Sequence, residues 1–227
     1  MKRSSINRRI KEAIAFLDEQ NFRLPPFAFW TPEQWASKGH ECDEIRDCRL
    51  GWDLCDFGMG DFDRAGLLLF TIRNGHPTNP AYAEKTYCEK ILISQEDQVC
   101  QMHYHWNKVE DIINRGGGNL VIKLYNATED DDLADTDVEV SIDGVRKRFP
   151  AGTDVVLAPG ESICLPQKLY HAFWAQAGHG PVLSGEVSKV NDDESDNKFH
   201  EPLGRFPEIE EDEPAEYLLM NEYPAEG

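Results

Sequence analysis

The apolar positions of the first twenty residues follow helical spacing: Ile6, Ile10, Ala13, Ile14 and Leu17. Three- and four-residue intervals place these side chains on one face, so we predict an amphipathic helix over residues 5–20 with Ser5 as its N-cap. A second short helix is predicted to begin after Thr31. Thr31 can serve as the N-cap, Pro32 fits the first helical turn, and Gln34 stands where a capping box needs its partner.

From Gly66 the pattern changes to short apolar or alternating runs divided by Gly, Pro and Asp-Gly turns, which is typical of antiparallel β-structure. Strands are predicted at residues 67–73, 87–93, 99–105, 120–125, 138–142, 145–149, 155–157, 163–165, 171–175 and 182–187. Asp143-Gly144 marks the clearest hairpin, because a type I′ turn needs a positive φ at both central positions. Such a run of strands predicts an all-β fold, a barrel or jelly roll that closes to hide its edges.

The chain is expected to fold as a single domain in three parts, since β-barrels of 227 residues form one domain. Residues 1–60 would form an N-terminal helical extension packed on the barrel, and residues 61–190 the barrel itself. Residues 191–227 are acidic and contain proline, and we expect them to cover the barrel. Their densest acidic run, residues 208–213, is expected to be solvated.

The formal net charge of −19 gives the folded surface a negative potential. Over a Debye length of about 8 Å this potential repels phosphate backbones and anionic headgroups. We therefore expect neither a nucleic-acid nor a membrane partner, and a small neutral monosaccharide suits the field better than a phosphorylated substrate. Charged residues interrupt the N-terminal apolar run, and no apolar stretch approaches the roughly 20 residues that cross a bilayer, so a cytoplasmic protein is expected.

The six cysteines include no Cys-x-x-Cys pair and are expected to be reduced thiols. A zinc site at Cys42, Cys48 and Cys55 is the alternative, but their spacing matches no standard structural zinc site.

Two histidines and a glutamate form the strongest chemical pattern. His103 and His105 project from the same face of a strand, so both imidazoles can point into a barrel, and the turn after them can bring Glu110 around. Imidazole and carboxylate ligands suit Mn, Fe, Co, Ni or Zn. A lone His-x-His pair would more often pack or face solvent, and Glu110 shifts the balance toward a metal site.

This segment and a later one resemble the two motifs of the cupin family. The first reads His-x-His-x4-Glu-x6-Gly and ends at Gly117, and the second reads Gly-x5-Pro-x4-His from Gly160 through Pro166 to His171. The resemblance implies a cupin β-barrel of the jelly-roll type, with the helical extension at its N-terminus. It also makes His171 the fourth ligand, beside His103, His105 and Glu110, of one divalent metal per chain.

The chain departs from the cupin pattern at three positions. Asp97 and Lys168 stand where cupins usually have glycine, and Ala175 stands where they usually have asparagine. These changes affect turn geometry rather than ligand atoms. A cupin without metal is the alternative, and the retention of three histidines and the glutamate argues against it.

Further segments resemble the D-lyxose ketol-isomerase family of cupins: residues 51–53 (Gly-Trp-Asp), 90–92 (Lys-Ile-Leu), 103–110, 204–207 (Gly-Arg-Phe-Pro) and 210–213 (Glu-Glu-Asp-Glu). The resemblance covers most of residues 1–220. It implies interconversion of D-lyxose and D-xylulose, with D-mannose and D-fructose as a second pair, and Mn²⁺ as the ion. Barrels of this type often pair, so a homodimer is expected.

Aldose–ketose isomerisation moves a proton between C2 and C1 through an enediol, so the site needs a base. We predict Glu186 as that base, with a pKa raised by burial, because an inward position on its strand would follow the strand that carries His171. Lys90 would donate to a sugar oxygen from inside its own strand. Either side chain could instead face solvent on the outer wall.

Substrate contacts are predicted from five residues. Lys108 lies between two ligands, Asp193 and Arg205 could bind distal hydroxyls, and Trp52 and Phe173 could form apolar walls, unless these aromatic rings simply pack in the core. Two other functions stay open: an iron-dependent cupin dioxygenase, and a sugar-binding cupin without turnover.

Overall fold

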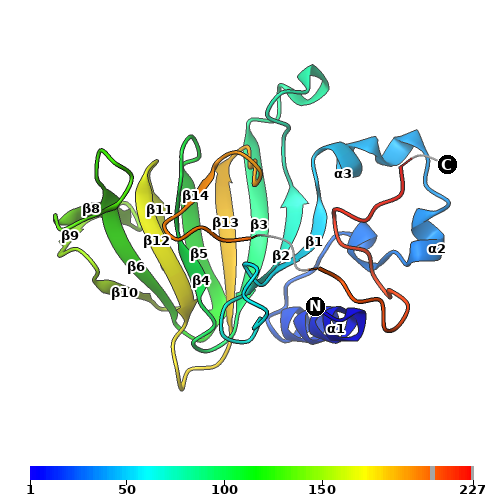
Figure 1. The fold of residues 1–227 in the computed structure, drawn as a ribbon, viewed down its shortest axis with the longest axis horizontal. Coiled ribbons are helices and arrows are strands. Elements are labelled where there is room, and N and C mark those ends of the chain that lie inside the picture. The colour runs from blue at the N-terminus through cyan, green and yellow to red at the C-terminus, as the bar shows by residue number, and fades with distance from the viewer. Residues whose placement is uncertain (205–207, 226–227) are drawn as a thin grey trace.

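The computed structural model describes residues 1–204 and 208–225, and these are mostly β-structure (Figure 1). One eight-stranded sheet runs in the order β1-β2-β3-β13-β5-β11-β8-β9, and a second runs β10-β6-β12-β4-β14 with β7 paired to β6. The strands are β1 (Gly51–Cys55), β2 (Leu67–Arg73), β3 (Tyr87–Ser94), β4 (Cys100–His105), β5 (Glu110–Gly117), β6 (Leu120–Ala127), β7 (Leu133–Ala134), β8 (Val138–Ile142), β9 (Val145–Phe149), β10 (Asp154–Leu157), β11 (Ser162–Leu165), β12 (Leu169–Ala175), β13 (Val182–Lys189) and β14 (Asn197–Phe199).

The helices gather beyond β1 at one side of the sheets (Figure 1). They are α1 (Arg3–Glu19), α2 (Pro32–Trp35) and α3 (Asp43–Asp47), with the 3₁₀ turns η1 (Pro26–Phe29), η2 (His40–Cys42) and η3 (Pro80–Tyr82). The predicted capping box of α2 is confirmed, because Thr31 and Gln34 bond each other reciprocally. The prediction for α1 is wrong at its start: Lys2, not Ser5, is the N-cap.

The predicted all-β fold is confirmed, and each predicted strand is found within two residues at either end. Asp143 and Gly144 have φ values of 50° and 79°, as the predicted hairpin requires. Four strands were not predicted: β1, β5, β7 and β14. Every residue of β1 is buried, so the strand has no polar alternation, and β5 begins with two acidic residues and ends in two glycines.

Two apolar layers hold the fold together, one on each face of the eight-stranded sheet. Leu92 belongs to the layer between the two sheets, which also contains Phe173. Its neighbours Ile91 and Ile93 belong to the second layer, where α1 packs through Ile10 and other apolar residues. Side chains of a strand alternate between faces, so β3 contributes to both layers. The functional site lies in the layer between the sheets.

Two departures from the cupin motifs keep the backbone shape that glycine would give. Asp97 and Lys168 have φ values of 56° and 57°, in the left-handed region that favours glycine. Both turns therefore keep the backbone geometry of a glycine turn, with some backbone strain at Asp97 and Lys168.

The acidic run at residues 208–213 is not simply solvated, as the charge pattern suggested. Arg3 is 1% exposed, its guanidinium bonds Glu211 at 2.9 and 2.6 Å, and it also pairs with Glu222. The Oδ1 atom of Asp212 accepts from the backbone N–H of Ser4 at 2.9 Å. The C-terminal segment thus accepts hydrogen bonds from backbone N–H groups in the first turn of α1. This explains why the helix needs no side-chain cap of its own.

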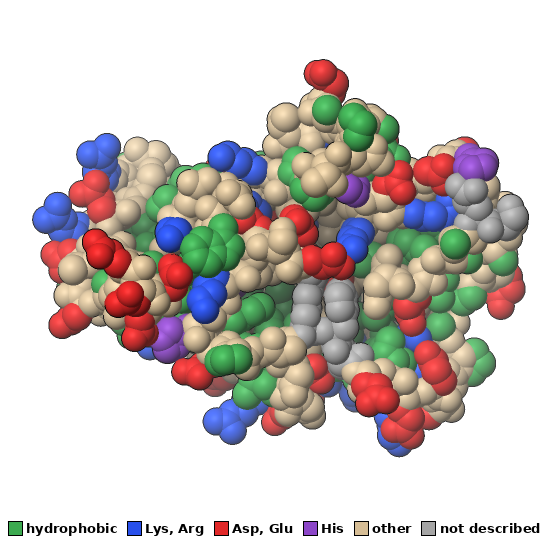
Figure 2. Space-filling model, turned by 45° about the horizontal axis from the view of Figure 1, so that its top comes forward, with side chains coloured by type: hydrophobic (Ala, Val, Ile, Leu, Met, Phe, Trp, Pro, Cys, Tyr) green, Lys and Arg blue, Asp and Glu red, His purple; other side chains and the backbone are tan. Residues whose placement is uncertain are grey.

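In residues 1–204 and 208–225, no helix is long and apolar enough to span a bilayer. Figure 2 shows acidic side chains scattered over the visible face, with lysine and arginine side chains between them. On this face the net charge is therefore distributed rather than gathered into one patch.

Candidate metal centre and active site

A cavity between the two sheets brings together most of the predicted site residues. Those that line it are Lys90, His103, His105, Lys108, Glu110, Phe173, Glu186 and Asp193. The histidines come from the smaller sheet, whereas Lys90, Glu110 and Glu186 come from the larger one. Residues of the two groups are separated by up to about 80 positions in the sequence, and the fold brings them together in one core.

The three histidines converge through the pairing of β4 with β12. His103 and His171 are direct partners in that ladder, and His105 follows two positions along β4. One ligand nitrogen from each ring lies within 4.8 Å of the others. His103 Nδ1 is 2.7 Å from the carbonyl oxygen of Gln101, and His171 Nδ1 is 2.9 Å from that of Leu169. A carbonyl oxygen only accepts, so each ring carries its proton on Nδ1 and turns the Nε2 lone pair inward.

Glu110 lies beside this cluster at the first position of β5, where the turn after β4 brings it around as expected. Its Oε1 atom lies 3.3 Å from His105 Nε2 and 3.1 Å from His171 Nε2. The carboxylate is 3% exposed. Burial raises the pKa of Glu110, but Lys108 and His105 outweigh that effect and hold the pKa well below its usual range. Glu110 is therefore an anion beside the imidazoles of His105 and His171.

The imidazoles of His103 and His105 are held in the form that binds metals. Burial lowers the pKa of His103 well below its usual value, and the neighbouring His171 and His105 rings lower it further. Burial and the Lys108 ammonium also lower the pKa of His105. Neutral imidazole is the ligand form, so no proton has to leave these rings at neutral pH.

The donor set fits one divalent cation of the Mn-to-Zn series. Three imidazole nitrogens lie close together, the Glu110 carboxylate lies beside two of them, and two of the rings are fixed by backbone carbonyls. His171 Nε2 is buried and has no hydrogen-bond partner in the part of the chain that the structure describes. A buried imidazole nitrogen with a free lone pair fits the role of a metal ligand.

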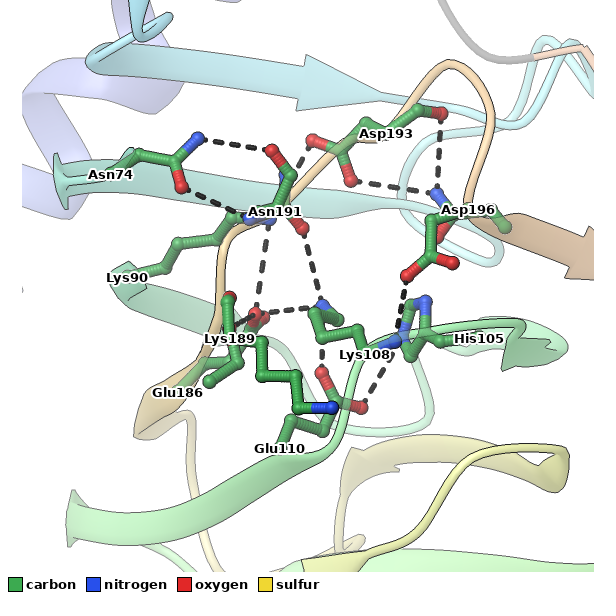
Figure 3. Close-up of polar contacts among 12 residues, drawn as sticks. Asn74, Lys90, His105, Lys108, Glu110, Glu186, Lys189, Asn191, Asp193 and Asp196 are labelled. Atoms are coloured by element: carbon green, nitrogen blue, oxygen red, sulfur yellow. Dashed lines mark hydrogen bonds and ion pairs between the residues drawn. The ribbon is translucent and has the colours of Figure 1, made fainter. Parts of the chain in front are cut away.

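Lys108 joins the metal-side carboxylate to a second one (Figure 3). Its Nζ atom is 2.8 Å from Glu110 Oε2 and 2.8 Å from Glu186 Oε1, and the residue is 3% exposed. Burial alone would lower the pKa of Lys108, but Glu110 and Glu186 raise it above the ordinary lysine value. Lys108 is thus a permanent cation between the two acids.

Glu186 points into the cavity and is 4% exposed. The predicted rise of its pKa is wrong in direction. Burial does raise the pKa, but the ammonium groups of Lys108 and Lys90 outweigh it, and the pKa lies below its usual value. Lys108 and Ser188 both lie within hydrogen-bond distance of Oε1, at 2.8 and 3.1 Å. Both of these contacts are made to Oε1 and neither to Oε2.

Lys90 is the cross-strand partner of Glu186 in the β3–β13 ladder. Its Nζ atom lies 4.0 Å from Glu186 Oε1 and 3.5 Å from Asp193 Oδ2, and Asp193 also lines the cavity. Phe173 supplies an apolar wall from β12. These three residues surround the space beside Glu186.

Of the predicted substrate residues, Trp52 does not take the expected place. Trp52 does not line the cavity: its ring packs against Phe70 in the layer beneath α1, and its indole N–H donates to the carbonyl of Ala28 at 2.8 Å. Alternation along β1 sends its neighbour Asp53 to the cavity instead. Arg205 lies outside the described residues.

Sequence reasoning missed three polar residues around the site. Asp53 lines the cavity, Asn191 contacts Lys108, and Asp196 accepts from the backbone N–H groups of Asn107 at 2.7 Å and Lys108 at 3.0 Å. Alternation in β1 could have indicated Asp53, had the strand been predicted. The other two lie in a loop, where no periodic signal exists.

Comparison with known proteins decides the family. A family model described as D-lyxose isomerase matches residues 1–223. The chain belongs to the D-lyxose isomerase family. It is 50% identical over 224 residues to the D-lyxose/D-mannose isomerase of Escherichia coli O157:H7 and equally to that of Serratia proteamaculans, covering 98% of each chain. The suspected family resemblance is therefore confirmed.

Solved structures show the same fold in a more distant group. The L-ribose isomerase of Cellulomonas parahominis without ligand superposes with a TM-score of 0.60 at 16% identity, covering 92% of this chain and 98% of that one. The L-ribose isomerase of Acinetobacter sp. DL28 in complex with L-ribose gives a TM-score of 0.58 at 15% identity, covering 88% and 93%. At these identities the likeness concerns the fold, and it confirms the cupin-type architecture of this family member.

Proposed function

We propose that the chain is a metal-dependent aldose–ketose isomerase that interconverts D-lyxose and D-xylulose, and also D-mannose and D-fructose. Family membership over nearly the whole chain supports isomerase chemistry over the dioxygenase and the non-catalytic sugar binder. The observation that carries the proposal is the pair of buried carboxylates, Glu110 and Glu186, bridged by Lys108 in the cavity that also contains the histidines. One acid faces the metal cluster, and the other faces the space for the sugar.

In this proposal His103, His105, Glu110 and His171 hold one divalent ion, with Mn²⁺ as the preferred metal. When bound, the ion would act as a Lewis acid that stabilises the negative charge developing on the sugar oxygens.

Glu186 would take the proton from C2 of the aldose and return it to C1, while the proton of the C2 hydroxyl passes to the C1 oxygen. Its Oε1 atom is anchored by Lys108, so Oε2 can approach the substrate in a fixed orientation. The lowered pKa keeps the carboxylate ionised and ready to accept. Lys90, on the neighbouring strand, would donate a hydrogen bond to the oxygen that gains charge, and Asp193 and Arg205 would contact distal hydroxyls.

A ketose assay on D-lyxose, with and without a chelator, tests the proposal. Exhaustively chelated protein should be inactive, and Mn²⁺ should restore activity better than Mg²⁺, which prefers oxygen ligands. Equal activity of the chelated and the metal-loaded protein would rule out the metal mechanism. Oxygen consumption would indicate a dioxygenase, and a sugar-dependent rise in melting temperature without product would indicate a binder.

We also propose that the chain acts in the cytoplasm as a single-domain homodimer, with the helical extension and the C-terminal segment folded onto the barrel. Light scattering checks the oligomeric state, because the dimer has twice the 25.9 kDa mass of one chain.

A further inference from the structure

Lys108 has a third acceptor outside the carboxylate pair (Figure 3). Asn191 Oδ1 accepts from Lys108 Nζ at 3.2 Å, in addition to Glu110 Oε2 and Glu186 Oε1 at 2.8 Å each. An ammonium group has three N–H donors, so Asn191 completes the set. A buried lysine with three acceptors is held in one position, because every alternative rotamer leaves a buried charge without partners.

Asn191 is itself fixed by Asn74. The backbone N–H of Asn191 donates to Asn74 Oδ1 at 3.0 Å, and Asn74 Nδ2 donates to the carbonyl of Asn191 at 3.0 Å. The Asn74 side chain therefore pairs with this peptide on both sides, across 117 positions of sequence. The two residues are 5% and 8% exposed.

The same amide reaches the N-terminal helical extension. Asn74 Nδ2 also donates to the carbonyl of Cys48, directly after α3, at 3.3 Å. The end of β2, the end of β13 and the end of α3 thus meet at one buried amide, which leads through Asn191 to Lys108. Neither Asn74 nor Asn191 lines the cavity between the sheets. Lys108 is the cavity-lining side chain that the Asn191 side chain contacts.

We propose that Asn191 and Asn74 are positioning residues that fix the Lys108 ammonium between Glu110 and Glu186, and that the helical extension takes part in this through Cys48. The catalytic consequence rests on the proposed function, in which Lys108 orients the base. The positioning of the ammonium group does not depend on it.

The kinetic test compares single and double variants in the full-length protein loaded with Mn²⁺. Asn191→Ala and Asn74→Ala should each lower kcat on D-lyxose by about 10- to 100-fold with KM changed less than about three-fold, because the base is misplaced while the sugar pocket is intact. Asn191→Asp keeps an acceptor oxygen and should recover most of the rate. In the Lys108→Met background, Asn191→Ala should cause no further loss.

Asn114→Ala is the matched control. Asn114 is also buried, with 0% exposed, and its Nδ2 atom donates to two backbone carbonyls at 2.9 Å, but it does not line the cavity. Its loss should lower the melting temperature and leave kcat of the folded protein unchanged. An equal fall of kcat in this control, or additive effects of Asn191→Ala and Lys108→Met, would overturn the inference.

A second readout does not use activity. A buried ammonium with three acceptors exchanges its protons slowly, so Lys108 should give a side-chain ¹⁵N–¹H signal by NMR in protein loaded with diamagnetic Zn²⁺ in place of Mn²⁺, assigned through its absence in Lys108→Met. Asn191→Ala and Asn74→Ala should broaden this signal beyond detection, and Asn114→Ala should keep it. An unchanged Lys108 signal in the first two variants would refute the positioning role. If the signal responds as expected but the parent protein makes no ketose, the proposed function fails and the positioning role stands.

Discussion

His103 and His171 face each other directly in the β4–β12 ladder, with ring centroids 4.2 Å apart. One comes from each cupin-like motif, so the pairing of two strands brings together two of the three clustered histidines. Both Nδ1 atoms are tied to backbone carbonyls of their own strands. The ring orientations are therefore a property of the sheet and do not depend on the ion.

His171→Ala should consequently abolish metal binding and keep the fold intact. Loss of an outer-shell partner already costs about 10- to 100-fold in metal affinity, so loss of a ligand should reduce Mn²⁺ affinity by more than about 100-fold. The chelated variant should unfold with a free energy only about 1 to 2 kcal/mol below that of the chelated parent. Metal analysis measures the bound Mn²⁺, and denaturant unfolding measures the free energy of unfolding. His179→Ala, at an exposed turn, is the control, and equal metal retention in the two variants would refute the cluster.

Lys90→Met should reduce kcat/KM on D-lyxose by about 100-fold or more, because the variant removes a donor beside Glu186 and keeps the length of the side chain. Steady-state kinetics measure the effect. Lys123→Met is the matched control: this lysine also lies on a strand and pairs with Asp154 at 3.2 Å, but it does not line the cavity. Similar rates for both variants would remove Lys90 from the mechanism.

The strain at Asp97 predicts a stabilising substitution. Asp97→Gly should raise the free energy of unfolding by about 0.5 to 1 kcal/mol, because glycine adopts the φ of 56° without a steric penalty. Asp97→Ala should lower it, since alanine tolerates this region less well than aspartate. Denaturant unfolding of the two variants gives the order directly, and a more stable alanine variant would show that the turn is not strained.

The contact between Arg3 and the C-terminal segment predicts a pH-dependent loss of stability. Arg3→Met should cost about 3 kcal/mol near neutral pH, at the lower end of the range for broken buried pairs because Glu211 is 58% exposed. Hydrogen bonding from Arg3 lowers the pKa of Glu211, so this stabilisation is present above the unfolded pKa of about 4.3 and is lost as pH falls through the lower folded value. The difference in free energy of unfolding between the parent and Arg3→Met should therefore become smaller below about pH 4. A constant gap in denaturant unfolding down to pH 3 would contradict this assignment.

Much of the fold follows from local patterns in the sequence. Alternation predicted β8 and β9, and the Asp143-Gly144 turn fixed their hairpin. The same method failed for β1, whose five residues are all buried. It also failed for the C-terminal segment, because the partner that orders Glu211 is a buried arginine 208 positions away.

The convergence of His103 and His105 was predictable because strand geometry places both on one face of β4, and the resemblance to the second cupin motif added His171. The environment of Glu186 was not, since its pKa depends on two lysines from other segments, Lys90 and Lys108. Alternation correctly turned Glu186 inward, but it could not tell whether apolar residues or cations would surround the carboxylate. Only the assembled sheets bring those charges together.

Turnover by Glu186→Gln in D₂O tests the central claim most directly. The amide keeps the shape of the carboxylate but cannot accept a proton, so kcat on D-lyxose should fall by about 10²- to 10⁴-fold with little change in KM and in Mn²⁺ content, and the parent should place deuterium on C1 or C2. Glu89→Gln, on the adjacent strand with its carboxylate paired to Arg73 at 2.6 Å, should behave as the parent. A Glu186→Gln variant within a few-fold of the parent rate, or parent product without deuterium, would contradict proton transfer by Glu186.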